Sequence, residues 1–527
     1  MKGRRTVKSI IIAAFLWITI LGCIAVLVKY LVIPQVRNIR EDFLAGQTGS
    51  GGQYQHVIRF GLDNFSGYCI LRSSGFRKQL KEQGIKLVLN DDGADYPRRL
   101  KALQRGKLQM AVFPINSFLQ CGVAKGSFPA TIVYVLDETV GADAIIGYKS
   151  RVENIQSLND SSAQIVLTPD SPSEFLARIM LANFNLPEFP SNNWIVKADG
   201  SAEVYDRFRT EQPSTPIAYA MWEPEVSKAL ENPEAHVLLD SSMVKGYIVD
   251  VLVVERSFLI ENYDAVKAFI EAYARTAFAY QDKMSDLIIE DSEASQNTIS
   301  KDQALKIVKG IQWKNTLENF AHFGLQPSFH SFDNIEDILL KVSDVLVKTG
   351  MFEESQFAQE DLTDLYFDKI LREMKSDGFH PGEASLNIVQ GTSGGLGQET
   401  LRDRGNLRQL SEEQWEGLQQ VGEFQVDPIR FGRGTSRLNV QSRHHLRDLA
   451  ETLHSWPEYY VQVIGRVRSG NEDNPLALSL AKERAREAVR VLVENGIEEE
   501  RIRSSAEMGD SNSADSQTVS FVVGRPQ

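Results

Sequence analysis

The chain has 527 residues, 42% of them hydrophobic, and its formal net charge is -13 at pH 7. This length exceeds one ordinary domain and suggests about three units of roughly 150 residues each. The acidic balance argues against a general nucleic-acid binder, which usually carries a basic surface. It fits an acidic ectodomain, and we expect no nucleic-acid partner.

The first 34 residues predict a membrane anchor. Four basic residues among the first eight precede an apolar run, Ile10 to Val28, whose one polar residue is Thr19. About 20 apolar residues cross a bilayer as one helix, and the basic flank stays in the cytoplasm. We therefore expect a single-pass protein of a bacterial inner membrane with the bulk of its chain in the periplasm.

The apolar run and the cysteines of the chain limit what kind of anchor and fold to expect. The segment "ILGC", which ends at Cys23, faintly resembles a lipoprotein cleavage box, so lipoprotein processing is the alternative to an uncleaved helix. The run contains no ionisable side chain, which disfavours a proton-driven stator. Beyond it only Cys69 and Cys121 remain, too few for a disulfide framework, and we expect both to be buried free thiols.

After a Gly-rich spacer, the chain alternates between strands and helices. "HVIRFGL" and "IKLVLND" read as strands that flank a short helix, and "YPRRLKALQRGKLQMAVFPINS" reads as a helix, a turn and a strand. Such spacing predicts parallel βαβ units. Ligands on these sheets bind beyond the carboxyl ends of the strands.

Five segments then occur in order: "GLDNFSGYCI", "RLKALQRGKLQMAVF", "GADAIIGY", "AYAMWEPEV" and "YIVDVLVVERSFLIENYDAVKAFIEAYARTAF". Together they resemble the periplasmic solute-binding proteins of the nitrate, sulfonate and thiamine-pyrimidine receptor group. The resemblance implies an α/β fold of two lobes with the ligand in the cleft between them. It places the two crossings near Gly141–Ala144 and Gly246–Val251.

The resemblance also implies candidate ligand contacts by position. These are Asn64, Phe65, Ser66, Pro114, Asn116, Asp143, Ser171, Ser173, Trp222, Glu223 and Asp250. Ser171 opens a helix at "SPSE", which is either an anion site or only a helix cap. Phe65 and Trp222 are either cleft walls or core aromatics.

The acidic candidates favour one ligand class. Asp143, Glu223 and Asp250 together favour a cationic or polar solute over an anion, unless they only cap helices or satisfy the backbone of the crossings. The sequence contains no Walker A, H-E-x-x-H or C-x-x-C motif, and its G-x-S-x-G match, Gly391 to Gly395, falls in the Gly- and Ser-rich linker and not at a strand-to-helix elbow. We therefore expect no enzyme, no cofactor and no metal site.

The last unit is a small α+β sandwich. "IRFG" and "YVQVIG" read as strands around a helix, "LAKERAREAVRVLVENGI" as a second helix, and "TVSFVV" as a closing strand. The unit resembles the OmpA C-terminal peptidoglycan-binding family. That family reads G-H-T-D after the second strand and N-x-x-L-S-x-x-R-A on the next helix, and its Asp and Arg grip the diaminopimelate of wall peptides.

This chain departs from the family motif in charge. Arg484 matches the family's Arg, but Arg466 and Arg468 fall within the first motif, and Arg468 takes the place of the Asp. An Arg about 4 Å from an ammonium group costs on the order of a few kcal/mol. The usual grip is therefore expected to be lost, unless Glu472 or Asp473 replaces it. The alternatives are a changed anionic partner and a purely structural module.

The predicted fold class is thus one transmembrane helix, a two-lobed periplasmic-binding-protein α/β fold and an OmpA-like α+β sandwich. The predicted divisions are 1–34 (cytoplasmic tip and anchor), 35–54 (spacer), 55–375 (two lobes, the second about 142–246), 376–423 (flexible linker) and 424–527 (OmpA-like domain). We expect an envelope sensor or scaffold whose partners are a small solute, the inner membrane, and peptidoglycan or another envelope component. The alternatives are a tethered substrate-binding component of an ABC transporter and a structural envelope protein that binds no ligand.

Overall fold

The computed structural model describes residues 54–210, 215–295, 298–326, 333–353, 362–381, 407–467, 475–508 and 519–526. The predicted transmembrane run at 10–28 and the motif residue Arg468 lie outside these ranges. Within them, no helix combines the length and apolarity that a bilayer crossing requires. The chain divides into the units 1–55 and 56–527, and the second unit is described below.

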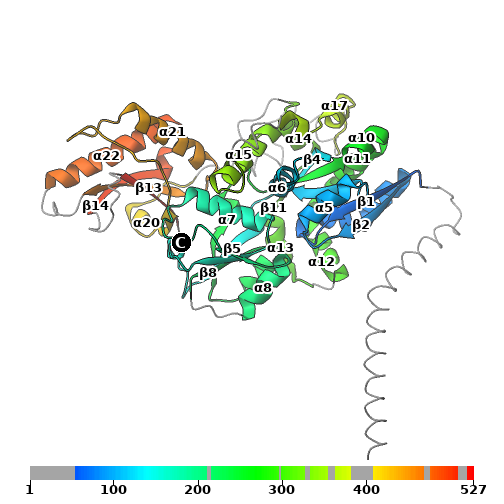
Figure 1. Cartoon of the computed structure of the whole chain (residues 1–527), viewed down its shortest axis with the longest axis horizontal. Coiled ribbons are helices and arrows are strands. Elements are labelled where there is room, and N and C mark those ends of the chain that lie inside the picture. Colours follow the sequence, from blue (N-terminus) through cyan, green and yellow to red (C-terminus); the bar gives the residue numbers. More distant parts are fainter. Residues whose placement is uncertain are drawn as a thin grey trace, which may run out of the picture. The chain divides into compact units, whose positions relative to one another are not determined.

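The first lobe is built on a six-stranded sheet (Figure 1). Its strands, in spatial order, are β11 (Ile311–Trp313), β4 (Ala130–Thr139), β10 (Val249–Glu255), β3 (Met110–Pro114), β1 (His56–Leu62) and β2 (Ile85–Asp91). Strands β1, β2 and β3 run parallel, whereas β10 is antiparallel to both of its neighbours. The larger helices of this lobe are α4 (Ser74–Glu82), α5 (Tyr96–Gln104), α6 (Ile115–Lys125), α11 (Tyr263–Tyr280), α12 (Met284–Ala294), α13 (Lys301–Lys309), α14 (Thr316–His322), α15 (Ile335–Lys348) and α17 (Lys369–Ser376).

The second lobe has a five-stranded sheet of its own. Its strands, in spatial order, are β7 (Ile195–Lys197), β6 (Gln164–Leu167), β8 (Ile217–Trp222), β5 (Asp143–Tyr148) and β9 (Ala235–Asp240). The accompanying helices are α7 (Pro172–Asn183), α8 (Gly200–Thr210) and α9 (Glu225–Ala229). Strand β5 is antiparallel to both neighbours, so each sheet places an antiparallel strand next to its parallel part.

The chain crosses between the lobes twice, as predicted. One crossing follows β4 and the other follows β9, and the amide of Thr139 donates to the carbonyl of Ile248 at 3.0 Å. Gly141 (φ 122°) and Gly246 (φ 74°) supply the left-handed backbone that each crossing needs. The Gly246 amide donates to Glu138, which forms a buried ion pair with Lys314 at 2.8 Å. The two crossings are therefore joined to each other and to the first lobe.

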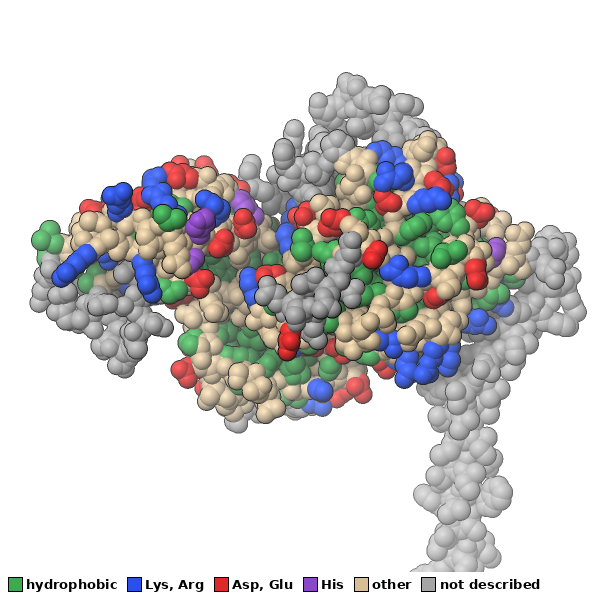
Figure 2. Space-filling view, turned by 45° about the horizontal axis from the view of Figure 1, so that its top comes forward, with side chains coloured by type: hydrophobic (Ala, Val, Ile, Leu, Met, Phe, Trp, Pro, Cys, Tyr) green, Lys and Arg blue, Asp and Glu red, His purple; other side chains and the backbone are tan. Residues whose placement is uncertain are grey.

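The C-terminal domain, defined here as residues 407–526, has a four-stranded sheet. The strand order is β12 (Gln419–Glu423), β15 (Val519–Arg525), β13 (Tyr460–Val467) and β14 (Ile502–Met508), and the helices include α21 (Val440–His454) and α22 (Pro475–Glu494). Each helix buries one face, including Leu446 and Leu453 of α21 and Ala485 and Leu492 of α22, and Trp456 after α21 is buried as well. Acidic and basic side chains are mixed over the face shown in Figure 2.

Two strands differ from the expectation. The predicted first strand, "IRFG", forms only an isolated bridge between Phe431 and Leu438. The edge strand is instead β12, which lies inside the segment predicted as linker and pairs with β15. Val421 and Gly422 are the buried residues of β12, and the strand is held by its pairing with β15.

Gly465 sets how closely α22 packs on β13. A Cβ at this position would lie 2.0 Å from the carbonyl oxygen of Ala481, a backbone atom that cannot move aside alone. We expect Gly465→Ala to destabilise the C-terminal domain by about 1–3 kcal/mol through overpacking. Chemical unfolding monitored by circular dichroism measures this, with Ser505→Ala on β14 as the control that should unfold like the parent.

Candidate functional site

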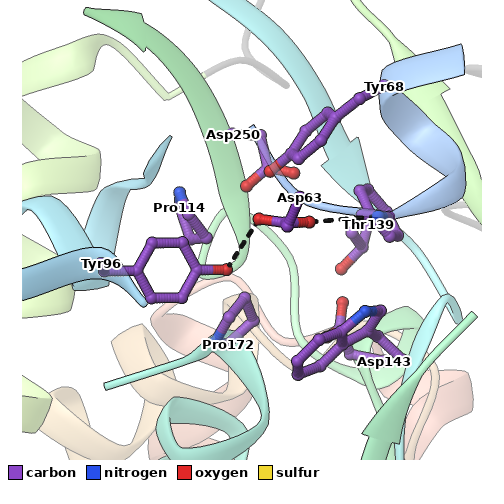
Figure 3. A pocket seen from close by; sticks show the side chains of 10 residues that line it. Asp63, Tyr68, Tyr96, Pro114, Thr139, Asp143, Pro172 and Asp250 are labelled. Atoms are coloured by element: carbon purple, nitrogen blue, oxygen red, sulfur yellow. Dashed lines mark hydrogen bonds between the residues drawn. The ribbon is translucent and has the colours of Figure 1, made fainter. Parts of the chain in front are cut away.

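A pocket lies where the two lobes meet (Figure 3). It is lined by Asp63, Phe65, Tyr68, Tyr96, Pro114, Thr139, Asp143, Pro172, Trp222 and Asp250. Its cavity volume is about 10 Å³, roughly the space for one water molecule. A larger solute therefore enters only when the lobes move apart.

The lining residues come from strand ends and from the crossings. Asp63 and Phe65 follow β1, Pro114 ends β3 and Trp222 ends β8. Asp143 begins β5, directly after one crossing, and Asp250 lies in β10, directly after the other. This is the edge at which sheets of this kind bind ligands.

Arg99 of α5 neutralises one of the acids. Its side chain is fully buried, and Nη2 lies 3.0 Å from Asp63 Oδ2 and 2.5 Å from Asp92 Oδ1. Nε also donates to Asp92, and Nη1 donates to the carbonyl of Val112 at 2.7 Å. Each of the three nitrogens of this guanidinium therefore already has a partner within the first lobe.

Asp137 and Asp250 are neighbours in register on β4 and β10. Both are buried, and burial raises the pKa of Asp137 to about 8. Burial first, and then the negative charge of Asp137, raises the pKa of Asp250 well above its ordinary value. Two buried carboxyl groups so placed cannot both be ionised without cost, so the pair retains a proton at neutral pH.

Asp143 and Glu223 form a second acidic group. Burial, followed by the charge of Glu223, raises the pKa of Asp143 to about 7. Burial likewise raises the pKa of Glu223 to about 7. Glu223 accepts hydrogen bonds from the amide and hydroxyl of Ser227 at 3.0 and 2.8 Å, which fixes it at the start of α9 and away from the pocket lining.

Several polar atoms of the lining lack partners within the described part of the chain. These are Asp143 Oδ1, Asp250 Oδ1, Thr139 Oγ1 and Trp222 Nε1. All four side chains are at least nine-tenths buried. Buried polar groups are normally hydrogen-bonded, so these atoms mark where a ligand supplies the missing partners.

Aromatic rings form much of the remaining wall. Phe65 and Tyr68 meet edge to face with centroids 5.2 Å apart, and Tyr96 and Trp222 complete the lining. Tyr96 donates from its hydroxyl to Asp63 (Figure 3). Tyr68 interacts with Asp250 and favours its ionised form. The pocket therefore combines carboxyl oxygens with π faces.

The predicted contacts fall into two sets. Phe65, Pro114, Asp143, Trp222 and Asp250 line the pocket. Asn64 is exposed, and Ser66, Asn116, Ser171, Ser173 and Glu223 are buried outside the lining.

Ser171 is a helix cap, since its Oγ accepts from the amide of Glu174 and donates to the carbonyl of Thr168. Asn116 joins the lobes, since its amide donates to the Ser171 carbonyl at 3.3 Å. The Ser171 hydroxyl is therefore engaged within its own lobe, whereas Asn116 Oδ1 has no partner among the described residues.

Sequence reasoning missed Asp63, Tyr68, Tyr96, Thr139 and Pro172 as lining residues. Asp63 could have been predicted as a lining residue, because it directly follows the first strand. The sequence gives no such indication for Tyr96, because α5 reaches the pocket only through its packing against β3 and β10.

In the C-terminal domain, both described motif arginines have protein partners. Arg466 donates to Ser520 Oγ at 3.0 Å and lies 3.5 Å from Glu423. Arg484 donates to the carbonyl of Thr435 at 3.0 Å and lies over the ring of Phe431. The charge reversal predicted at Arg468 concerns a residue outside the described ranges and stays a prediction.

Residues 430–520 match the model of the OmpA family. A search of curated proteins gives no significant match. The C-terminal domain therefore has the predicted fold, and the comparison covers that domain only.

Solved structures are similar to the two-lobed part. A Candida albicans protein described as having the generic periplasmic binding protein fold is 15% identical, covering 61% of this chain and 94% of its own, with a TM-score of 0.45. The alkanesulfonate-binding protein of Xanthomonas axonopodis pv. citri, bound to MOPS, is 13% identical, covering 56% and 94%, with a TM-score of 0.44. The nitrate-binding protein of Synechocystis PCC 6803 is 11% identical, covering 61% and 88%, with a TM-score of 0.45.

The buried carboxyl groups predict a stability that falls as the pH rises. Their pKa values in the folded state, about 8 for Asp137 and about 7 for Asp143, exceed the ordinary value of 3.8. The folded protein thus holds protons that the unfolded chain has already lost, and ionising these groups weakens only the folded state. His322, whose pKa is lowered to about 4, acts in the opposite direction, but only below about pH 6.5.

We therefore expect the melting temperature of the ligand-free protein to fall between pH 6.5 and pH 8.5. Asp250→Asn should raise it by a few degrees at pH 8.5 and by less at pH 6.5, because it removes one charge of the coupled pair. Differential scanning calorimetry measures both. An Asp250→Asn profile parallel to that of the parent would contradict the assignment of a proton to this pair.

Proposed function

We propose that the protein is an envelope sensor in which the two-lobed module binds a small solute and the C-terminal domain responds to lobe movement. The observation that carries this proposal is the docking of the C-terminal domain on the second lobe and on the crossing beside it. The proposal includes the predicted anchor at 10–28, which would hold the first lobe near the inner membrane.

The docking contact centres on Phe184, the residue that follows α7. Its ring meets the rings of Phe424 and Trp456 with centroids 5.2 and 5.5 Å away, and all three side chains are almost fully buried. Gly422 makes room for it, because a Cβ there would lie 2.6 Å from the Phe184 ring. The contact therefore resembles a protein core more than a loose surface encounter.

Backbone hydrogen bonds flank this aromatic cluster on both sides. The amide of Asn185 donates to the carbonyl of Glu423 at 2.8 Å, and the amide of Gln425 donates to the carbonyl of Asn183 at 2.8 Å. Phe184 and Phe424 thus form an isolated antiparallel bridge between the two domains. These directional bonds fix the register of the contact as well as its position.

The crossing itself is a second point of contact. The amide of Lys245, one residue before the hinge glycine Gly246, donates to the carbonyl of Ser455 at 2.9 Å. The Tyr459 hydroxyl contacts the sulfur of Met243. A change in the path of this crossing during lobe movement would therefore reach the C-terminal domain directly.

Helix α7 links the pocket to the docking contact. Pro172 at its first turn lines the pocket, and Phe184 follows its last turn. Its 12 residues span about 18 Å at 1.5 Å per residue. A shift of the second lobe around a solute would consequently move the docked domain as well.

The docking contact also lies close to β13, the strand of the C-terminal domain that carries the motif residue Arg466. Glu423 hydrogen-bonds with Asn185 of the second lobe and lies 3.5 Å from Arg466 of β13. Strand β13 leads towards the segment that holds Arg468. We propose that docking influences the motif residues that follow β13 in the sequence, Arg468 among them.

The alternative function is that of a tethered substrate-binding component of an ABC transporter. Solute delivery to a permease gives no evident use for a domain bound to the crossing, so the docking contact favours the sensor. A structural role without a ligand would leave the unpartnered pocket atoms unexplained.

Trapping the lobes in two states tests the sensor without any ligand. Ser117 Oγ donates to the carbonyl of Asp170 at 2.6 Å across the cleft. An oxidised Ser117→Cys/Asp170→Cys pair should hold the lobes together, and the bulk of Ser117→Trp should hold them apart. Fluorophores on azidophenylalanine at the exposed positions 81 and 451 would then report the distance from the first lobe to the C-terminal domain.

We expect different distances in the two traps of the full-length protein. Mass spectrometry of the oxidised pair verifies that the bond has formed. Equal distances in both traps would rule out coupling between lobe movement and the C-terminal domain.

Phe184→Ala tests the docking contact. Loss of a buried Phe costs about 3–5 kcal/mol in a packed core, and most of this loss should fall on docking. We expect calorimetry to resolve a separate, earlier transition of the C-terminal domain. Phe189→Ala removes a ring that packs on Trp194 within the second lobe, and this control should keep the domains in one transition.

A further inference from the structure

We infer that the solute is a small organic cation with an ammonium group, held between Asp143 and Asp250 and against the aromatic wall. The inference rests on the proposed receptor role of the cleft and specifies the ligand class. It is carried by the charges, the unpartnered atoms and the ring faces of the pocket.

The acids around the pocket outnumber the cations. Arg99 is shared between Asp63 and Asp92, and Lys314 is paired with Glu138. Lys314 also acts on Asp137, whereas the ion pairs found within the described ranges include none to Asp143 or Asp250. Buried acids of this kind either hold protons or face a positive charge, so a bound cation can take the place of a proton here.

The geometry shows where that charge belongs. Asp143 is 1% exposed and Asp250 is 2% exposed, and each has an Oδ1 atom without a partner among the described residues. Both line the same pocket from successive crossings, and in Figure 3 Asp63 and Thr139 are drawn between them. An ammonium group offers several N–H donors and a full positive charge, which meets both needs at once.

The aromatic wall fits the same ligand. Tyr68, Tyr96 and Trp222 line the pocket beside the carboxyl groups. Ring faces attract cations when the centre of charge lies within about 6 Å of the centroid. They also shield the alkyl part of an organic cation from water, which a bare inorganic ion would not require.

An anion finds no comparable site. The nitrogens of the Arg99 guanidinium are engaged by Asp63, Asp92 and a backbone carbonyl. The start of α7 offers little, because Pro172 has no N–H and the amide of Glu174 is already bound to Ser171. In the part of the chain that the structure describes, no three acidic, histidine or cysteine side chains are placed to hold a metal ion.

Binding of a cation should release the proton that the carboxyl pair holds. The charged and titratable groups that face Asp250 are Asp137 of β4, Asp143 of β5, Asp63 after β1, Tyr68, and Tyr96 of α5, with Arg99 behind Asp63 and Lys314 nearer to Asp137. Acids dominate this set, so a bound cation lowers the pKa of the pair. Affinity for the cation should therefore rise with pH.

Matched probes test the ligand class on the full-length protein. Ethanolamine and ethylene glycol have nearly the same size and differ in one ammonium group, and methylammonium and methanol form a second pair. Nitrate and methanesulfonate serve as small anions. Isothermal titration at pH 6.5 and pH 8.0 measures the affinities, and a thermal-shift assay checks them.

We expect ethanolamine or methylammonium to bind at least tenfold more tightly than its neutral partner, and more tightly at pH 8.0 than at pH 6.5. Asp143→Asn and Asp250→Asn should each weaken this binding at least tenfold, whereas Asp282→Asn, at an exposed site, should not. Asp250→Asn is expected to fold at least as stably as the parent, so its loss of binding would not reflect unfolding.

Three results would overturn the inference. The first is tighter binding of an anion than of any ammonium probe, and the second is equal binding of an ammonium probe and its neutral partner. The third is no binding of either ammonium probe at about 10 mM, a concentration high enough to detect a weak ligand with a Kd of roughly 1 mM. Because the trapping experiment uses no solute, the sensor proposal stands or falls separately from this one.

Discussion

The buried acids at the two crossings are the constraint around which the cleft is organised. Asp143 and Asp250 lie where the chain passes from one lobe to the other, and Asp137 stands beside Asp250 in the neighbouring strand. Burial of these groups is tolerated only while they hold protons or face a positive charge. The apposition of the lobes, the pocket that they enclose and the choice of solute therefore depend on one electrostatic requirement. A cation satisfies it without changing any backbone contact, whereas an anion would add to the imbalance.

Helix α7 connects the pocket to the docking contact with the C-terminal domain. One end of the helix contributes to the pocket, and the residue after its other end lies among the rings of Phe424 and Trp456. A helix transmits displacement along its axis because its hydrogen bonds resist compression. The arrangement thus places a solute site and an OmpA-type module at opposite ends of one rigid element. The second contact, at Lys245, adds the crossing itself to the same connection.

Much of the fold could be predicted from the sequence, because strand and helix periodicities alternate clearly and the resemblance to solute-binding proteins implies where the crossings lie. Asp143, Trp222 and Asp250 could be placed at the pocket, because they follow strand ends or crossings. The free, buried state of Cys69 and Cys121 was predicted correctly. Tyr96 and Arg99 could not be predicted as site residues, since they reach the pocket only through packing of α5 on the sheet. Strand β12 was missed because its Gln and Gly residues are typical of a linker. The docking contact had no signal at all, since Phe184 looks like any apolar residue at the end of a helix.

The C-terminal domain follows the first lobe in the chain, since α17 packs on α14 beside β4, yet it docks on the second lobe. It is therefore attached to one lobe by covalent bonds and to the other by a packed, non-covalent contact. A mechanical pull on this domain, such as a growing or swelling cell wall would apply, would load the contact at Phe184 and the crossing at Lys245. If the cleft binds a solute as proposed, the contacts that would report it to the C-terminal domain would also carry tension from that domain back to the cleft. A pull on the domain would then alter how readily the cleft opens.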